Sequence, residues 1–136
     1  MKTRRKPTIQ PPDMWVMSLH EEFQREFMHL DEDIRDELLA AARAIEIAGP
    51  KHGRPLVDTL KQSKYDNMKE IRFTSQDGTQ IWRAAFAFDP ERRGVILAAA
   101  NKQGKNEKLF YKKLIAVADA RFGLHLKALD RKEKEK

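Results

Sequence analysis

Hydrophobic periodicity predicts two helices in the first part of the chain. Phe23, Phe27 and Leu30 recur at spacings of four and three residues, which is typical of one helix face. A second helix is expected to begin after Asp31, whose side chain can cap it, and to end at Gly49-Pro50. The apolar stripe of this second helix consists of Ile34, Leu38, Ala41 and Ile45.

The hydrophobic period then changes to that of β-strands. Residues 69–73 alternate between polar and apolar side chains, and residues 76–79 have the composition of a turn. A second strand is expected over residues 81–88. One of its faces carries Trp82, Ala84, Phe86 and Phe88, and the other carries Ile81, Arg83, Ala85 and Ala87. Residues 95–100 are apolar on both faces and are expected to form an interior strand.

The remaining segments complete an α+β order of elements. Residues 14–17 predict a short strand, and residues 50–68 predict irregular structure with one helical turn at 56–60. Helical periodicity returns over residues 105–123. The side chains expected to face inward there are Phe110, Leu114, Val117 and Ala118. The order is therefore a strand, two helices, a meander of antiparallel strands and a last helix.

The chain of 136 residues has room for one domain, expected at residues 14–126. Residues 1–13, with three prolines, are expected to form a flexible basic arm, and residues 127–136 a charged tail that is either a frayed helix or disordered. The sequence has no Cys, no signal-peptide core and no apolar run long enough to cross a membrane. We therefore expect a soluble cytoplasmic protein. The four His residues lack metal-ligand spacing, so no metal or other cofactor is expected.

The formal net charge of +6 conceals an uneven distribution. Residues 13–49 carry a net charge of −7, whereas residues 50–126 carry +7. This division predicts one anionic face and one cationic face, and the cationic face would meet a polyanion such as RNA. The alternative is that the opposite charges only solvate the surface and attract one another.

Arg83 is the most unusual side chain of the expected sheet. Its strand face carries Ala85 and Ala87, so we expect a shallow floor on which a guanidinium can bind a phosphate through two hydrogen bonds. Arg72 is expected across from it or diagonal to it on the preceding strand. Lys102 and Lys105 follow the end of the next strand, a common place for functional groups.

Each of these side chains also has a simpler explanation. Arg83 can form a salt bridge with Glu70 or Asp89, and the two lysines can be solvated surface groups. The joint placement of the cations at strand ends supports the functional interpretation.

If the polyanion is RNA, cleavage needs no metal, because the ribose 2′-OH can attack the adjacent phosphorus. Arg and Lys side chains can stabilise the developing charge, and a Tyr or His can transfer protons. Tyr111, His125 and His52 are the candidates for proton transfer, although Tyr111 can pack beside Phe110 and both histidines can be surface groups. The sequence contains no Gly-rich phosphate loop, no GxSxG and no HExxH.

Three segments of the sequence resemble a known toxin family. They are "GRPLVDTLKQSKYDNMKEIRF", "WRAAFAFDPERRGVILAAANKQGK" and "FYKKLIAVADARFGLHL". Together they are similar to the HigB-like branch of the RelE/ParE toxin superfamily, and the likeness extends from about Trp15 to Leu126. The resemblance implies a small antiparallel sheet with two amino-terminal helices packed on it and a carboxy-terminal helix. It also implies metal-independent cleavage of mRNA on the ribosome, and neutralisation by a helix-turn-helix antitoxin of the HigA type.

The resemblance also assigns roles to individual residues. Arg83 corresponds to the sheet arginine that contacts the scissile phosphate, Arg72 and Lys102 line the same site, and Tyr111 lies near a late tyrosine of some relatives. Glu70 departs from the family, because some ribonuclease relatives have a basic group there. The basic side chains expected to contact RNA are Lys51, His52, Arg54, Lys69, Arg92, Arg93 and Lys105. Because one branch of the superfamily inhibits gyrase, the alternatives are a protein-binding toxin without nuclease activity and an inactive RNA-binding protein of phage origin.

Overall fold

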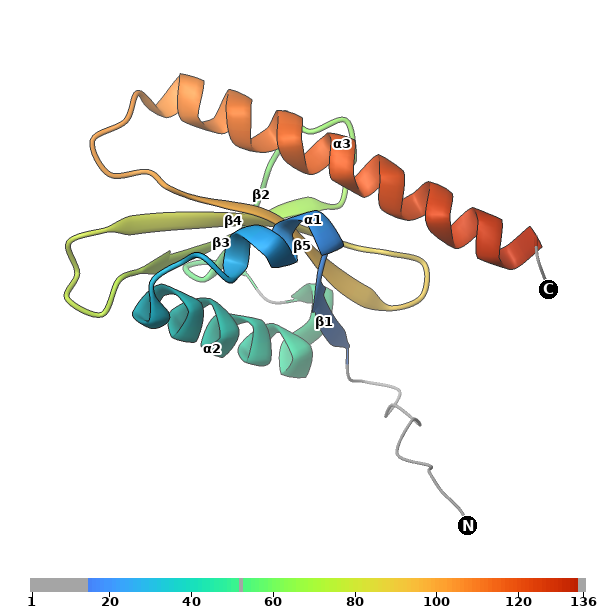
Figure 1. Cartoon of the computed structure of the whole chain (residues 1–136), viewed down its shortest axis with the longest axis horizontal. Helices are drawn as coiled ribbons and strands as arrows, with labels where there is room; N and C mark the ends of the chain where they lie inside the picture. Colours follow the sequence, from blue (N-terminus) through green and yellow to red (C-terminus); the bar gives the residue numbers. More distant parts are fainter. Residues whose placement is uncertain (1–14, 52, 135–136) are drawn as a thin grey trace, which may run out of the picture.

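A five-stranded sheet separates two layers of helix in the computed structural model, which describes residues 15–51 and 53–134 (Figure 1). The elements are β1 (Val16–Leu19), α1 (Glu21–Phe27), α2 (Glu32–Ala48), η2 (Gly49–Lys51), β2 (Val57–Thr59), β3 (Met68–Thr74), β4 (Ile81–Phe88), β5 (Arg93–Asn101) and α3 (Glu107–Lys134). Helices α1 and α2 cover one face of the sheet, and α3 covers the other (Figure 1). The α+β class predicted from the sequence is confirmed.

The strands lie in the order β1-β5-β4-β3-β2. The predicted antiparallel meander is correct for β3, β4 and β5, but β1 pairs parallel to β5, so the sheet is mixed rather than purely antiparallel. The helical turn predicted at residues 56–60 is wrong. Val57–Thr59 instead pairs with β3 as a short edge strand, because that register buries Val57 opposite Ile71.

The predicted helices and strand faces follow the hydrophobic pattern closely. The expected apolar stripe of α2 is buried against the sheet, and the helix ends at Gly49, whose φ of 67° suits a residue without a side chain. Ala84, Phe86 and Phe88 lie in the core beneath α1 and α2. The opposite face of β4 packs under α3, as the alternation of side chains along a strand requires.

Helix α3 is longer than the sequence pattern predicted. It continues to Lys134, so of the two expectations for the charged tail, a frayed helix or disorder, residues 127–134 follow the helical one. Val117 was expected to face inward but is 39% exposed, whereas Ile115 and Phe122 are buried beside Leu114. The second half of α3 is held to the β4–β5 loop by a 2.7 Å contact between His125 Nε2 and Asp89 Oδ2.

Several sequence-based expectations concern residues that the structure does not describe. The basic arm at residues 1–13, His52 and the last two residues lie outside the described residues. Within residues 15–51 and 53–134, no helix is both long enough and apolar enough to cross a membrane.

Candidate functional site

A cluster of polar side chains lies where the first turns of α3 cross β3 and β4. Glu70 and Arg72 project from β3 on the face that α3 covers, and Arg83 on β4 is paired directly with Arg72 in the strand register. Ala85 is the partner of Glu70, and its small side chain leaves space between the strands and α3. Tyr111, in the first turns of α3, fills that space above Glu70 and Arg83.

The centre of the cluster is buried and hydrogen-bonded. The side chains of Glu70 and Arg83 are only 5% and 7% exposed. Tyr111 Oη donates to Glu70 Oε1 at 2.7 Å and accepts from Arg83 Nε at 3.2 Å. Arg83 Nη1 donates to the carbonyl of Trp82 at 2.9 Å, and Arg83 Nε lies 3.6 Å from Glu70 Oε1. These contacts pair the buried charges, which would otherwise be costly to remove from water.

Cations and carboxylates alternate from this centre toward the solvent. Arg72 Nη1 lies 3.3 Å from Glu70 Oε2 and 3.9 Å from Asp58 Oδ2. Arg54 Nη1 in turn binds Asp58 Oδ2 at 3.0 Å. Arg72 therefore links the buried carboxylate of Glu70 to the exposed Arg54–Asp58 pair at the surface. Its side chain is partly exposed and can reach an incoming anion.

These residues form one side of an open groove of about 600 Å³, here called the polar groove. Its lining residues are Arg54, Asp58, Thr59, Leu60, Lys61, Gln62, Glu70, Arg72, Lys102, Glu107, Lys108, Tyr111 and Ile115. Lys102 binds Glu107 at 2.7 Å, and its Nζ lies 5.6 Å from the centre of the Tyr111 ring. The lining carries more basic than acidic side chains, so the groove favours an anionic ligand.

The surroundings of the polar groove shift the pKa values of two side chains. Burial and the hydrogen bond to Glu70 raise the pKa of Tyr111 above its ordinary value, so the phenol is protonated at neutral pH. The hydrogen bond from Lys102 lowers the pKa of Glu107. The site thus offers guanidinium and ammonium donors, a phenol donor and one buried carboxylate acceptor. Among the described residues, no group of three His, Asp or Glu side chains could hold a metal ion.

The structure brings together the four side chains predicted to form a catalytic site. Arg72, Lys102 and Tyr111 line the polar groove, and Arg83 lies directly beneath Tyr111. The sequence predicted a shallow floor beside Arg83. This prediction is wrong, because Ala85 and Ala87 are fully buried under α3. The simpler explanation of Arg83 that the sequence left open was a salt bridge to Glu70 or Asp89, and the salt bridge to Glu70 is present.

The residues predicted to contact RNA do not gather at this groove. Arg54 lines it, whereas Lys69 points to the opposite face of β3. Arg92 and Arg93 lie at the far end of β5, where the Arg92 guanidinium packs over Trp15. Lys51 is exposed in η2, and Lys105 lies in a second groove on the other side of α3.

Sequence reasoning missed the central position of Glu70. Glu70 lies two residues before Arg72, and residues at this spacing share one strand face, so alternation could have placed the pair together. Asp58 was missed because its segment was predicted as a helical turn. As a β2 residue, it lies opposite Glu70.

Comparison with known proteins identifies the family. Residues 25–123 match the family of phage-derived Gp49-like proteins. Two Mycobacterium tuberculosis proteins named as the toxins HigB2 and HigB3 are similar in sequence. HigB2 is 42% identical over 97 residues, which is 71% of this chain and 47% of HigB2. HigB3 is 40% identical over 98 residues, which is 72% of this chain and 82% of HigB3. The chain thus spans about half the length of HigB2 and most of HigB3.

The fold has a relative among solved structures. A free-state structure of the Escherichia coli toxin RelE, carrying two arginine-to-alanine substitutions, superposes with a TM-score of 0.58 and covers 79% of this chain and 97% of its own. Only 12% of residues are identical, so this likeness concerns the fold alone. The expected resemblance to the HigB branch of the RelE/ParE toxins is confirmed, and the chain belongs to the Gp49-like family of phage-derived proteins.

Proposed function

We propose that this chain is the toxin of a type II toxin–antitoxin pair and that it cleaves mRNA without a metal ion. Its similarity to proteins named as HigB toxins supports the toxin assignment. The observation that carries the chemistry is the arrangement of Glu70, Tyr111 and Arg72 at the polar groove, with Lys102 at its rim. This arrangement combines a carboxylate that can accept a proton with several side chains that can donate hydrogen bonds to a phosphate.

The proposed reaction is an internal transfer at phosphorus. The ribose 2′-oxygen attacks the adjacent phosphorus, the bond to the 5′-oxygen breaks, and the products are a 2′,3′-cyclic phosphate and a free 5′-OH. Glu70 accepts the 2′ proton, and Lys102 donates a proton to the leaving 5′-oxygen. Arg72 exchanges its carboxylate partners for the phosphate and stabilises the charge that develops in the transition state.

Arg83 has a different role in this proposal from the one that the family resemblance implied. Its side chain is buried beneath Tyr111 and does not line the polar groove. Through its hydrogen bond to Tyr111 Oη and its contact with Glu70, Arg83 acts as a positioning residue for both groups. Direct contact of Arg83 with the scissile phosphate stays a prediction, and it would require Tyr111 to move.

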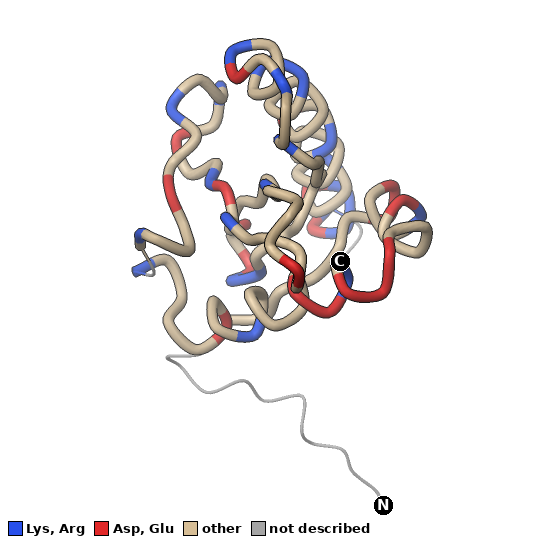
Figure 2. The backbone as a smooth tube through the Cα atoms, turned by 90° about the vertical axis from the view of Figure 1, so that its left-hand side faces the viewer, with Lys and Arg blue, Asp and Glu red and all other residues tan. Residues whose placement is uncertain are grey.

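The partners in this proposal are the ribosome with its mRNA, and a helix-turn-helix antitoxin of the HigA type. The basic side chains of the polar groove suit a ribosomal surface, which is rich in phosphate. Figure 2 shows Lys and Arg gathered on α3 at the top of the view and acidic stretches lower down.

Mapping mRNA 5′ ends after induced expression tests the function. We expect new ends inside translated reading frames with the wild-type chain, and none with the Glu70→Gln variant. RNA without ribosomes should be cleaved poorly, because translating ribosomes are the proposed site of action. Intact mRNA accompanied by DNA damage would contradict the proposal and favour the gyrase-inhibiting class.

A further inference from the structure

One wall of the polar groove takes no part in the proposed cleavage chemistry. This wall, here called the β2–β3 wall, consists of residues 59–62, at the end of β2 and in the turn that leads to β3. All four residues line the groove, whereas the proposed reaction uses side chains of β3 and α3 and the lysine after β5. Such a wall can contact a part of the substrate that does not react.

The β2–β3 wall is held in place by contacts with both β3 and α3. The amide of Leu60 donates to the carbonyl of Met68 at 2.9 Å, and the amide of Ser63 donates to the carbonyl of Leu60 at 3.2 Å. Ser63 Oγ donates to Asp119 Oδ1 at 2.5 Å, and the amide of Lys64 donates to Asp119 Oδ2 at 3.1 Å. One carboxylate of α3 therefore fixes the turn directly after the wall, so the side chains of the wall start from a defined backbone.

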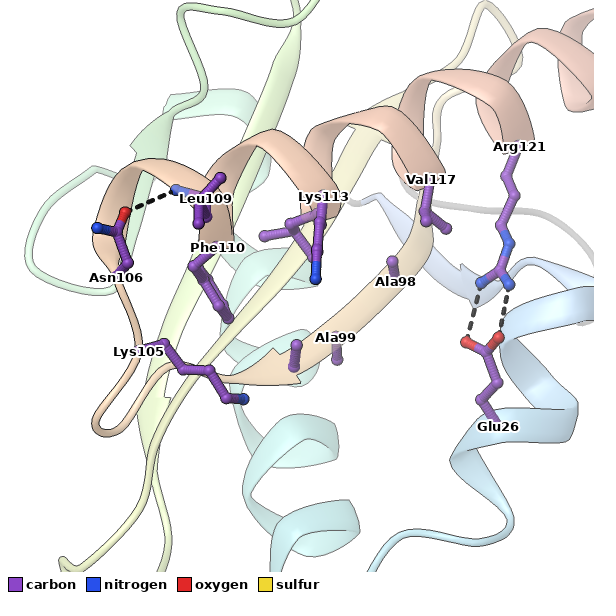
Figure 3. Close-up of a pocket in the computed structure, with 12 residues that line it drawn as sticks. Glu26, Ala98, Ala99, Lys105, Asn106, Leu109, Phe110, Lys113, Val117 and Arg121 are labelled. Carbon is purple, nitrogen blue, oxygen red and sulfur yellow. Dashed lines mark hydrogen bonds and ion pairs between the residues drawn. The ribbon is translucent and has the colours of Figure 1, made fainter.

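The face of α3 that carries this carboxylate also carries the phenol of the reaction site. Tyr111, Ile115 and Asp119 follow one another at intervals of four residues and so share one face of the helix. Each interval corresponds to about 6 Å along the helix axis. Lys113 and Val117 lie on the other side of α3, where they face a separate groove (Figure 3). The β2–β3 wall is therefore anchored about two helical turns beyond the phenol, on the same side of α3.

An apolar patch lies in this interval. Leu60 of the wall and Ile115 of α3 both line the polar groove and belong to one hydrophobic cluster. They are only 5% and 7% exposed, so their positions are fixed by packing. An unpaired RNA base has a flat apolar face that can pack on such a patch.

Two polar side chains of the wall are free to bind a ligand. Lys61 and Gln62 are exposed, and among the described residues neither side chain has a polar partner. The amide of Gln62 has two N–H donors and one carbonyl acceptor, so it can bond to a base edge that presents both kinds of group. The ammonium of Lys61 can only donate, which suits a phosphate.

We propose that the β2–β3 wall seats an unpaired base of the mRNA next to the scissile phosphate. The face of the base would pack on Leu60 and Ile115, and its edge would bond to the side-chain amide of Gln62. This inference rests on the proposed function, because it takes mRNA as the ligand of the polar groove. Gln62 would then influence which sequences are cleaved without taking part in the reaction.

Cleavage of matched reporter mRNAs tests the proposal. Pairs of reporters differ only by cytosine or uracil on one or the other side of a cleaved bond. Cytosine presents an amino group where uracil presents a carbonyl oxygen, and a carboxylate can accept a hydrogen bond only from the former. We expect Gln62→Glu to raise the ratio of cleavage at cytosine to cleavage at uracil about tenfold at one of the two positions. An unchanged ratio would overturn the proposal.

Lys61→Gln is the matched control, because it changes the charge of the same wall by the same amount. It can lower the overall rate of cleavage, but it should leave the cytosine-to-uracil ratio as in the wild type. An equal change of the ratio in Lys61→Gln and Gln62→Glu would also overturn the proposal, since the ratio would then report charge rather than contact with a base.

Nuclear magnetic resonance provides a readout that does not depend on cleavage. An oligonucleotide with 2′-O-methyl sugars throughout lacks the attacking hydroxyl and serves as the probe. Its addition should shift the side-chain amide signals of Gln62 but not those of Gln24, which is exposed on α1. Equal shifts at both residues, or no shift at Gln62, would overturn the base contact.

The outcomes also separate this inference from the proposed function. If the wild-type chain cleaves mRNA but Gln62→Glu leaves the ratio unchanged, only the base contact fails. If the chain cleaves no mRNA but the uncleavable oligonucleotide shifts the Gln62 amide, the proposed cleavage fails and the base contact stands.

Discussion

Tyr111 on α3 donates a 2.7 Å hydrogen bond to the carboxylate of Glu70 on β3. This bond joins the last helix to the sheet at the edge of the polar groove, and Arg83 supports it from below through its hydrogen bond to the same phenol. The contact makes one carboxylate both a structural partner and the proposed proton acceptor. Changes at this contact should therefore alter stability and activity together, whereas changes at the rim should alter activity alone.

Tyr111→Phe should change how stability depends on alkaline pH. Burial and the hydrogen bond to Glu70 raise the pKa of Tyr111, so the folded state keeps the phenol proton at a pH where the unfolded chain loses it. The resulting stability is fully present below an unfolded-state pKa of about 10 and is lost as the pH rises through the folded-state pKa. Urea unfolding should show the wild type losing its advantage over Tyr111→Phe above about pH 10. A constant difference would contradict the shift.

Arg72→Ala should lower the rate of mRNA cleavage by about 100-fold while leaving the fold intact, because a partly exposed cation that contacts the transition state is lost. Lys69→Ala is the matched control, since Lys69 lies on the same strand but points to the other face of the sheet. Cleavage rates on translated mRNA and circular dichroism give the comparison. Equal cleavage rates for the two variants would show that Arg72 is not part of the catalytic site.

Arg83→Ala should destabilise the fold as well as reduce cleavage, because the buried carboxylate of Glu70 loses one of its cationic partners. We expect a loss of about 1–3 kcal/mol in the free energy of unfolding. Adding Glu70→Ala should recover part of this loss, since the unpaired buried charge is then removed. Denaturant unfolding of the two single variants and the double variant measures the coupling. Strictly additive losses would show that the pair is not coupled.

Glu26→Gln should weaken the contact between α1 and α3 only above acidic pH. Hydrogen bonding to Arg121 lowers the pKa of Glu26, so its contribution is present above the unfolded value of 4.5 and is lost as the pH falls through the folded value. At neutral pH we expect a loss of up to about 1 kcal/mol, because the pair is partly exposed. Asp36→Asn, on the exposed face of α2, is the control. Urea unfolding at neutral pH and below about pH 4 measures both variants.

Ribosome association should weaken strongly between low and moderate salt, because basic side chains that neutralise phosphates release counterions. Reversing the charge of Lys102 and Lys108, which line the polar groove, should flatten this dependence. Reversing Glu21 and Glu22 on α1 should change it little. Sedimentation with ribosomes at several salt concentrations measures the slope. Equal slopes for the two pairs of variants would contradict a single basic face.

Local pattern alone determined most of the elements of this protein. The stripe of α2 and the two faces of β4 were predicted correctly, because these patterns arise from neighbours within one helix or strand. Arg72 was expected across from Arg83 or diagonal to it, and the register makes the two residues direct partners. Lys102 was chosen as a candidate because it follows the end of a strand, and Tyr111 because a phenol early in the last helix can transfer protons.

Only the tertiary structure decided which groups are buried and which strands pair. β1 pairs with a strand far along the chain, and nothing in its four residues encodes that partner. The same holds for β2, whose three residues become a strand only beside β3. Arg83 became a buried group because α3, which follows it in sequence, packs over its strand face. Short segments carry too little periodicity to specify long-range contacts, so these pairings and the burial of Glu70 and Arg83 emerge only when distant elements pack together.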